Sequence, residues 1–504
     1  MPTARRAAGT QFTLRATRTK ITLRDSCVSN TVWQDSCVRE RRQKKQRISR
    51  SLEQWLTILA VALISLVAFE TLAVATAMPF VVEFLDGQHL YALAAGVALA
   101  TQLMTTALAG PWTDAKGPKP SLYTGLGLFV LGLTVASFAP NIEVIVLGRA
   151  IQGLGGGLMI VPLYVFVGNY VAPERQPKIF AWFSAAWVVP SLIGPFVAGF
   201  FVEHLNWRLV FGIVPLVILL ILPMLIVQFR KFPDLHPPLP FGRHRRVVFF
   251  GATTGVAVAG IQVLSGMRGD SFGWPVVAVV VALSALAFIL VRPLLPAGTL
   301  SSRPGLPATV LLRGIVNGAF IATEIFLPLM LKEVHGWSPT QAGLIMTTGS
   351  ITWAVGSWIQ GKVESPSGRT LLPIVGTAVQ LIGTALTIPA AFPTVPGVVA
   401  IAGWLIAGLG IGIVYPALTV HGLGITPPER HGMTSSALSL ADTMGGALLV
   451  AWAGILFAAA FALDHVAFVV VIAAMSLVLA AGLLVTKRVL EVTPEHLPTS
   501  DSTQ

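Results

Sequence analysis

Long apolar runs separated by short polar connections occupy most of the chain. An α-helix needs about 20 apolar residues to cross a bilayer, and fourteen runs have this length. They lie at residues 55–81, 90–111, 121–139, 142–171, 179–203, 207–228, 246–266, 273–292, 306–331, 339–360, 370–391, 395–420, 433–461 and 466–486. The pattern predicts an all-α polytopic membrane protein with 14 transmembrane helices.

A repeat divides these runs into two halves. Positions in the fourth run and the loop after it recur 255 positions later, in the twelfth run and its loop. The matches are Gly148, Gly153, Leu154, Gly155, Gly157, Pro173, Glu174 and Arg175 with Gly403, Gly408, Leu409, Gly410, Gly412, Pro428, Glu429 and Arg430. Because both copies begin in an even-numbered run, the halves have the same orientation, as in transporters built from parallel repeats.

The repeat predicts two six-helix bundles with two extra spans between them. We expect a basic cytoplasmic tail at 1–52, a first bundle at 53–229, a basic, Pro-rich linker with the two extra spans at 230–304, a second bundle at 305–488 and a cytoplasmic tail at 489–504. The high charge and low hydrophobicity of the first tail are typical of disordered segments.

Composition excludes a water-soluble globule. Hydrophobic residues make up 54% of the 504 residues and charged residues only 11%, whereas soluble domains contain about 25% charged residues. The net charge of +12 does not indicate a nucleic-acid partner, because 13 of the 34 Lys and Arg residues lie in residues 1–50 and most others fall in short loops.

The basic residues also predict the orientation. If both termini are cytoplasmic, the 13 basic residues of the tail and 16 in loops and the C-terminus lie inside, whereas only Arg208, Arg268 and Lys332 lie outside. This distribution follows the positive-inside rule. We therefore expect a monomeric, multi-pass protein of the cytoplasmic membrane, in contact with lipids and targeted by its first span rather than by a cleaved signal peptide.

Five charged residues lie well inside the expected spans: Glu70, Arg149, Arg313, Glu324 and Asp442. Charges inside a bilayer are costly, so they usually face the protein interior and mark function. Glu70 lies about fifteen residues, roughly 23 Å, past the inner end of its span, at a depth that Arg149 can reach. Burial disfavours an ionised carboxyl group and a guanidinium favours it, so the pair can load and release a proton. A permanently protonated Glu70 that hydrogen-bonds between helices is the alternative.

The other three charges predict a polar cavity in the second half. Glu324 and Arg313 share a helix face but stand about 16 Å apart along it, so each needs another partner. Ser435, Ser439, Asp442 and Gly446 form a stripe of helical period, which we expect to face the cavity. Adhesion between helices through Ser and Gly remains an alternative for the serines.

Two local motifs resemble signatures of the major facilitator superfamily. Gly110-Pro-Trp-Thr-Asp114-Ala-Lys-Gly117-Pro-Lys119 is similar to its inner-loop motif, although Ala115 and Pro118 stand where Arg is usual. The resemblance implies that Gly110, Asp114, Gly117 and Lys119 gate the inner side. Arg149, Gln152 and Gly153 match the family's Arg-containing motif, which is linked to proton transfer.

Two further motifs resemble the 14-span drug/proton antiporters of this superfamily. Gly194-Pro195 and Gly199 are similar to the antiporter Gly-Pro motif, and Phe69-Glu70-Thr71 through Ala77-Met78-Pro79 is similar to the acidic motif of the first span, with Glu where Asp is usual. The resemblance covers roughly residues 53–488 and implies the major facilitator fold. It also implies proton-driven export of drugs or amphipathic small molecules.

Enzyme chemistry is not indicated. Gly356-Ser-Trp-Ile-Gln-Gly361-Lys362 has P-loop spacing, but Val363 replaces the required Ser or Thr and the segment ends an apolar run. We expect no metal and no cofactor, with the proton gradient as the energy source. An uptake symporter that uses the same acids, or a membrane scaffold or lipid-handling protein without transport, remains an alternative.

Overall fold

The computed structural model describes residues 49–172, 175–233, 245–266, 273–363, 365–427 and 431–491. By their contacts, the described residues belong to one compact unit. Most of both expected tails, much of the linker after residue 233, and the Pro-Glu or Pro-Glu-Arg ends of the two repeat copies lie outside the described residues. The division into five segments is therefore still a prediction.

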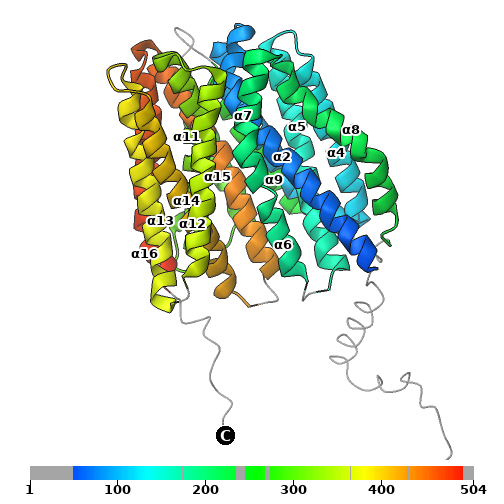
Figure 1. Cartoon of the computed structure of the whole chain (residues 1–504). Coiled ribbons are helices and arrows are strands. Elements are labelled where there is room, and N and C mark those ends of the chain that lie inside the picture. The colour runs from blue at the N-terminus through cyan, green and yellow to red at the C-terminus, as the bar shows by residue number, and fades with distance from the viewer. Residues whose placement is uncertain are drawn as a thin grey trace, which may run out of the picture. The chain divides into compact units, whose positions relative to one another are not determined.

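The described part of the chain is helical, as expected, and contains no strand. The N-terminal half, α2–α8, comprises α2 (Arg50–Phe84), α3 (Tyr91–Lys116), α4 (Pro118–Ser137), α5 (Ile142–Tyr170), α6 (Gln176–Ala185), α7 (Val188–His204) and α8 (Arg208–Arg230). The linking pair is α9 (Arg245–Leu264) and α10 (Trp274–Val291). The C-terminal half, α11–α16, comprises α11 (Leu306–His335), α12 (Pro339–Lys362), α13 (Pro366–Leu386), α14 (Val398–Gly424), α15 (His431–Ala460) and α16 (Val466–Leu490). Figure 1 shows these helices running side by side along one direction.

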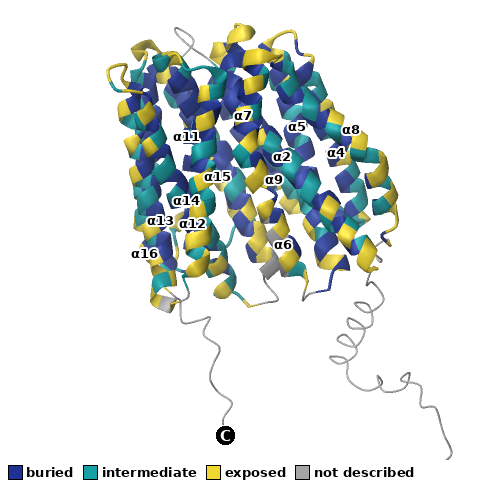
Figure 2. Ribbon diagram, in the orientation of Figure 1, coloured by how far each residue is buried: buried dark blue, intermediate teal, exposed yellow. Residues whose placement is uncertain are grey.

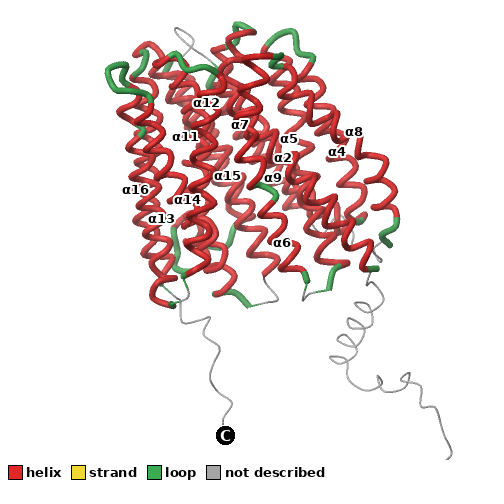
Figure 3. The backbone as a smooth tube through the Cα atoms, in the orientation of Figure 1, coloured by secondary structure: helices red, strands yellow, loops and turns green. Residues whose placement is uncertain are grey.

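Short polar segments fix where the helices begin. The Ser49 hydroxyl accepts a hydrogen bond from the Leu52 backbone N–H and caps α2. At α12, Ser338 and Gln341 form a reciprocal capping box, with Pro339 in the first turn. Such caps satisfy backbone N–H groups that have no partner inside the helix. The tube in Figure 3 shows that only short loops join most helices.

Twelve of the described helices are long and apolar enough to cross a membrane, compared with the expected fourteen. Helices α7 and α12 occupy the places of the other two expected runs. Helix α7 is short, with 17 residues, and the 24 residues of α12 include many Thr, Ser, Gly and Gln residues. The structure therefore establishes an all-helical protein with 12 candidate spans, and the count of 14 is still a prediction.

The fifth expected run is not one continuous helix. It divides into α6 and α7 around Ala186 and Trp187. A proline ring clashes with the carbonyl four residues earlier and cannot donate a hydrogen bond there, and Pro190 stands four residues after Ala186. The Ser65 hydroxyl on α2 instead donates a 3.0 Å hydrogen bond to the Ala186 carbonyl. The interruption is therefore built into the sequence and stabilised by α2.

Both copies of the glycine repeat permit close helix packing. A Cβ at Gly153 would stand 2.2 Å from the Ala98 carbonyl oxygen on α3, and a Cβ at Gly408 would stand 2.3 Å from the Gly349 carbonyl oxygen on α12. Other glycines of the repeat approach α4 and α13 in the same way. These glycines act in helix packing, because only glycine allows two backbones to approach so closely.

Among the described residues, the two halves meet mainly where α7 packs against α12, α3 against α15, and α2 against α11 and α12. The linking pair, α9 and α10, contacts the helices where the two halves meet. Helix α9 packs against both α3 and α15, and α10 packs against α9. The amide of Gln262 on α9 donates to the carbonyls of Gly96 on α3 and Ala447 on α15. Figure 2 shows the buried residues concentrated along the faces that the helices turn toward one another.

Candidate functional site

Glu70 and Arg149 form a buried ion pair in the N-terminal half, as their positions in the sequence predict. Arg149 on α5 donates from a terminal nitrogen to the Glu70 carboxylate on α2 and, at 2.5 Å, to the Gln152 amide oxygen. Its Nε also points at the Ala94 carbonyl of α3, 3.4 Å away. Glu70 is 2% exposed, Arg149 5% and Gln152 4%. We call these three residues the acid–arginine cluster.

Local packing holds this cluster in place. Gly148 and Gly153 flank Arg149 on α5, and they bring α5 against α4 and α3 respectively. The guanidinium consequently lies among three helices rather than on a surface. A buried charge is tolerated only when it is paired and hydrogen-bonded, and here each polar side chain has a partner in the cluster. Protonation of Glu70 would remove the negative charge that holds Arg149. The gain or loss of one proton can therefore break or form this ion pair.

A second buried ion pair lies in the C-terminal half, between α11 and α15. Arg313 forms a bidentate ion pair with Asp442, with Nε 2.7 Å from Oδ1 and the terminal nitrogen Nη2 3.1 Å from Oδ2. Its other terminal nitrogen, Nη1, donates to the Tyr415 carbonyl at 2.6 Å and to the Thr419 hydroxyl at 2.7 Å. Arg313 therefore has a partner, as the sequence predicts, and the structure identifies this partner as Asp442.

Tyr415 and Thr419 complete this second cluster, and our sequence interpretation missed both. The Tyr415 hydroxyl donates to Asp442 at 2.9 Å, and its ring lies 3.2 Å from the Arg313 guanidinium carbon. The two residues are one helical turn apart on α14, so a search for polar residues at this spacing in apolar runs finds them. We call Arg313, Tyr415, Thr419 and Asp442 the arginine–aspartate cluster.

Glu324 does not receive the partner that we expected for it. It is half-buried on α11, and within the described residues its carboxylate has no hydrogen bond or ion pair. The offset of the repeat pairs Arg149 with Trp404 and Glu70 with Ile325. The second half therefore has neither member of the acid–arginine pair at the equivalent positions.

The serine stripe of α15 is only partly in the expected place. Ser435 and Ser439 are exposed, whereas Asp442 turns to Arg313 and Gly446 is buried beside Ile321. Only Asp442 among the polar members of the stripe joins a described cluster. The role of Ser439 in a cavity is therefore still a prediction.

The gating segment lies where α3 passes into α4. Gly110 stands within α3, and Asp114 lies in its last turn, although the Asp114 side chain lies outside the described part of the structure. Gly117 has φ +79°, a conformation that favours glycine, and separates the two helices. Lys119 follows in the first turn of α4. The structure therefore shows why glycine stands at 117, and the gating role itself is still a prediction.

The Gly-Pro motif lies at the seam between the two halves. A Cβ at Gly194 would stand 3.4 Å from the Phe69 ring on α2, next in sequence to Glu70, and a Cβ at Gly199 would stand 2.6 Å from the Pro339 carbonyl on α12. The Pro195 carbonyl in turn lies beside Gly343 on α12. These three motif residues thus allow α7 to touch both α2 and the C-terminal half.

Contacts between the halves gather at the end where α2 and α11 finish, which we call the far end. Lys332 Nζ lies 2.9 Å from Glu83 Oε2, and the Tyr91 hydroxyl on α3 donates to the Ile325 carbonyl on α11. The opposite end, the near end, is where α2 begins and α16 finishes, at the bottom of Figure 1. The far end is therefore joined across the seam by both an ion pair and a buried hydrogen bond.

Comparison with known proteins identifies the family. The model of the Major Facilitator Superfamily matches residues 58–450. The chain belongs to this superfamily. It is therefore a multi-pass membrane transporter, and the resemblance seen in the sequence motifs is confirmed.

Individual relatives are distant. The chain is 26% identical over 435 residues to MFS transporter L2 of a Phoma species, covering 81% of this chain and 70% of the relative. It is 24% identical over 390 residues to Multidrug resistance protein 3 of Bacillus subtilis, covering 75% and 74%. Multidrug transporters thus stand among the relatives of this superfamily member.

A solved structure confirms the superfamily fold. A bacterial homologue of the human lysosomal transporter Spinster, in an inward-facing and unoccupied conformation, aligns with a TM-score of 0.64. The alignment covers 89% of this chain and 100% of that chain at 14% sequence identity. At this identity the likeness establishes the arrangement of helices only.

Proposed function

We propose that this superfamily member exports amphipathic or cationic small molecules across the cytoplasmic membrane in exchange for protons. Its two halves alternate between inward and outward access around a central site. The observation that carries the proposal is the acid–arginine cluster, a carboxylate buried in a transmembrane helix whose only charged partner among the described residues is Arg149. The proton gradient supplies the energy, without a cofactor.

The coupling rests on competition for Glu70. While Glu70 is ionised, Arg149 neutralises it, and the buried pair is stable. A cationic substrate that approaches the carboxylate weakens the hold of Arg149, whereas protonation of Glu70 removes the site for the cation. Proton and substrate therefore occupy the acid in turn, which is the minimum requirement for exchange.

The arginine–aspartate cluster is a candidate substrate-facing site nearer the cytoplasm. Arg313 lies seven residues into α11, about 10 Å of helix, whereas Glu70 lies twenty residues into α2, about 30 Å. Asp442 keeps 17% of its side chain exposed, so a solute can reach it. Glu324 is an accessory acid in this proposal, and Asp114 with Gly110, Gly117 and Lys119 closes the near end.

The proposed topology follows from the loops. If α7, continued by α6, and α12 cross the membrane as well as the 12 candidate spans, the total is 14 and both termini share one side. The positive-inside rule then makes the near end cytoplasmic. In this proposal the protein is a monomer, and the ion pair of Lys332 with Glu83 helps to close its outer side.

Two rival functions make opposite predictions. A proton-driven uptake symporter can use the same acids, and a scaffold or lipid-handling protein does not need them. The multidrug relatives and the Gly-Pro motif at the α2–α7–α12 contact favour export. Both features concern direction of transport, which the buried ion pair alone does not decide.

Accumulation of a lipophilic fluorescent cation in cells tests the direction. Cells that express the wild-type protein should retain less dye than cells without it, and Glu70→Gln should restore retention. Glu143→Gln, which removes an exposed carboxylate at the start of α5, is the matched control and should behave as wild type. Higher retention in wild-type cells than in Glu70→Gln cells would indicate uptake, and equal retention would indicate that Glu70 does not support transport.

A further inference from the structure

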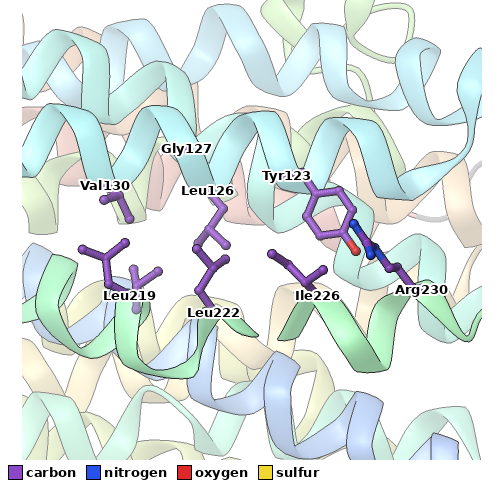
Figure 4. A pocket seen from close by; sticks show the side chains of 9 residues that line it. Tyr123, Leu126, Gly127, Val130, Leu219, Leu222, Ile226 and Arg230 are labelled. Carbon is purple, nitrogen blue, oxygen red and sulfur yellow. The ribbon is translucent and has the colours of Figure 1, made fainter. Parts of the chain in front are cut away.

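A groove between α4 and α8 on the outside of the N-terminal half has no role in the transport proposal. Its volume is about 320 Å³. It is lined by Tyr123, Leu126, Gly127, Val130, Ile218, Leu219, Leu222, Ile226 and Arg230. Apart from Tyr123 and Arg230, these residues present only apolar atoms. Figure 4 shows the aliphatic side chains along the groove and Tyr123 and Arg230 together at one end of it.

The polar end of the groove lies at the near end of the helices. Tyr123 is the sixth residue of α4, which begins there, and Arg230 is the last residue of α8, which ends there. Lys231 follows Arg230, and Lys119 precedes Tyr123 by one helical turn. A phosphate at this level therefore meets a concentration of positive charge, as at the interface of a bilayer, where Tyr, Lys and Arg gather.

The Tyr123 hydroxyl needs a partner. It is buried and makes no hydrogen bond within the described part of the chain, although it lies beside Arg230. Buried hydroxyl groups nearly always have a hydrogen-bond partner. A phosphate oxygen held between the Tyr123 hydroxyl and the exposed Arg230 guanidinium supplies one.

The apolar part of the groove is open where a lipid chain needs space. A Cβ at Gly127 would have nothing within 4 Å, and the lining residues follow each other at helical spacing along α4 and α8. We propose that the groove binds one anionic glycerophospholipid of the cytoplasmic leaflet. An acyl chain lies along the aliphatic residues, and Arg230 and Tyr123 hold the phosphate.

Native mass spectrometry of the purified full-length chain tests this site. The probes are dioleoyl-phosphatidylglycerol, dioleoyl-phosphatidylcholine and, as the headgroup without chains, glycerol 3-phosphate. We expect one phosphatidylglycerol to be retained in preference to phosphatidylcholine, and no retention of glycerol 3-phosphate. Arg230→Gln should weaken binding about tenfold, since a hydrogen bond to a charged group contributes about 1.5–3 kcal/mol.

Two further variants separate the headgroup from the chain. Tyr123→Phe should weaken the binding of phosphatidylglycerol a few-fold, because one hydrogen bond to the phosphate is lost. Gly127→Phe should remove the binding of both lipids, because the phenyl ring fills the groove. Arg292→Gln is the control, because it removes an exposed charge at the same end but outside the groove. Equal retention of the two lipids, equal effects of Arg230→Gln and Arg292→Gln, or displacement by glycerol 3-phosphate would overturn the proposal.

Discussion

The two halves of the transporter share their packing but differ in their buried chemistry. Gly153 and Gly408 bring equivalent helices into equally close contact, so the repeat preserves the backbone arrangement. The charged partners are not preserved. Glu70 pairs with Arg149 in the first half, whereas the equivalent arginine position in the second half is Trp404. Glu324 on α11 has no partner in the described residues.

This difference indicates how a symmetric scaffold acquires an asymmetric mechanism. Trp404 is fully buried and stacks on Phe320 with ring centroids 4.5 Å apart, so the second half uses this position for packing. The buried arginine of the second half is Arg313, which lies closer to the near end and binds Asp442. One half therefore carries an acid–arginine pair far along its helix, and the other carries a pair closer to the near end.

The largest expected change in the free energy of unfolding is in the acid–arginine cluster. Arg149→Leu leaves Glu70 buried without a partner, and breaking a buried ion pair in this way costs about 3–5 kcal/mol. Asp442→Asn should cost less, about 1.5–3 kcal/mol, because Arg313 keeps the Tyr415 carbonyl and the Thr419 hydroxyl. Unfolding in mixed micelles with increasing SDS measures both. Equal losses would remove the distinction between the two clusters.

The shared packing predicts equal losses in the two halves. Gly153→Ala and Gly408→Ala each place a Cβ within 2.4 Å of backbone and hydroxyl oxygens on the neighbouring helix, and overpacking of this kind costs about 1–3 kcal/mol. Gly168→Ala is the control, since nothing lies within 4 Å of its Cβ. A loss at Gly153 but not at Gly408 would show that the repeat does not preserve packing energy.

Glu324 should tolerate neutralisation. Glu324→Gln removes a carboxylate that has no described charge partner, so we expect the free energy of unfolding to change by less than about 1 kcal/mol. Glu70→Gln in the same assay should lower it by more, because Arg149 then loses its counter-charge. A loss at Glu324 as large as that at Glu70 would indicate a partner for Glu324.

The smallest effect on stability is expected at the far end. Lys332→Gln breaks the ion pair with Glu83, whose side chain is 58% exposed, and such pairs contribute about 0–1 kcal/mol. The variant should nevertheless open the far end more often. Labelling by a membrane-impermeant maleimide of a cysteine introduced at Phe80, which is 7% exposed and lies beside Lys332, measures this. The Phe80→Cys single variant, which keeps the ion pair, is the reference. Unchanged labelling would show that other contacts keep the far end closed.

The sequence predicted the helical fold, the superfamily and the pairing of Glu70 with Arg149, since each depends on local patterns or on the depth of two opposite charges along their spans. It did not predict the interruption between α6 and α7. This interruption depends both on Pro190, which cannot donate to the Ala186 carbonyl, and on Ser65 of α2, which donates to that carbonyl instead. It also missed Tyr415, because our interpretation of that apolar run rested on charged residues and on glycines, and Tyr415 is neither. The partner of Arg313 depends on how α11 and α15 pack, which the sequence does not specify.

Proton release in everted membrane vesicles tests the central claim most directly. A pH-reporting dye follows the vesicle lumen while amphipathic cations are added to vesicles with the wild-type protein, Glu70→Gln or Glu143→Gln. The account predicts that a transported cation triggers proton release from vesicles with the wild-type and Glu143→Gln proteins but not from those with Glu70→Gln. A substrate that triggers equal release from all three would contradict it.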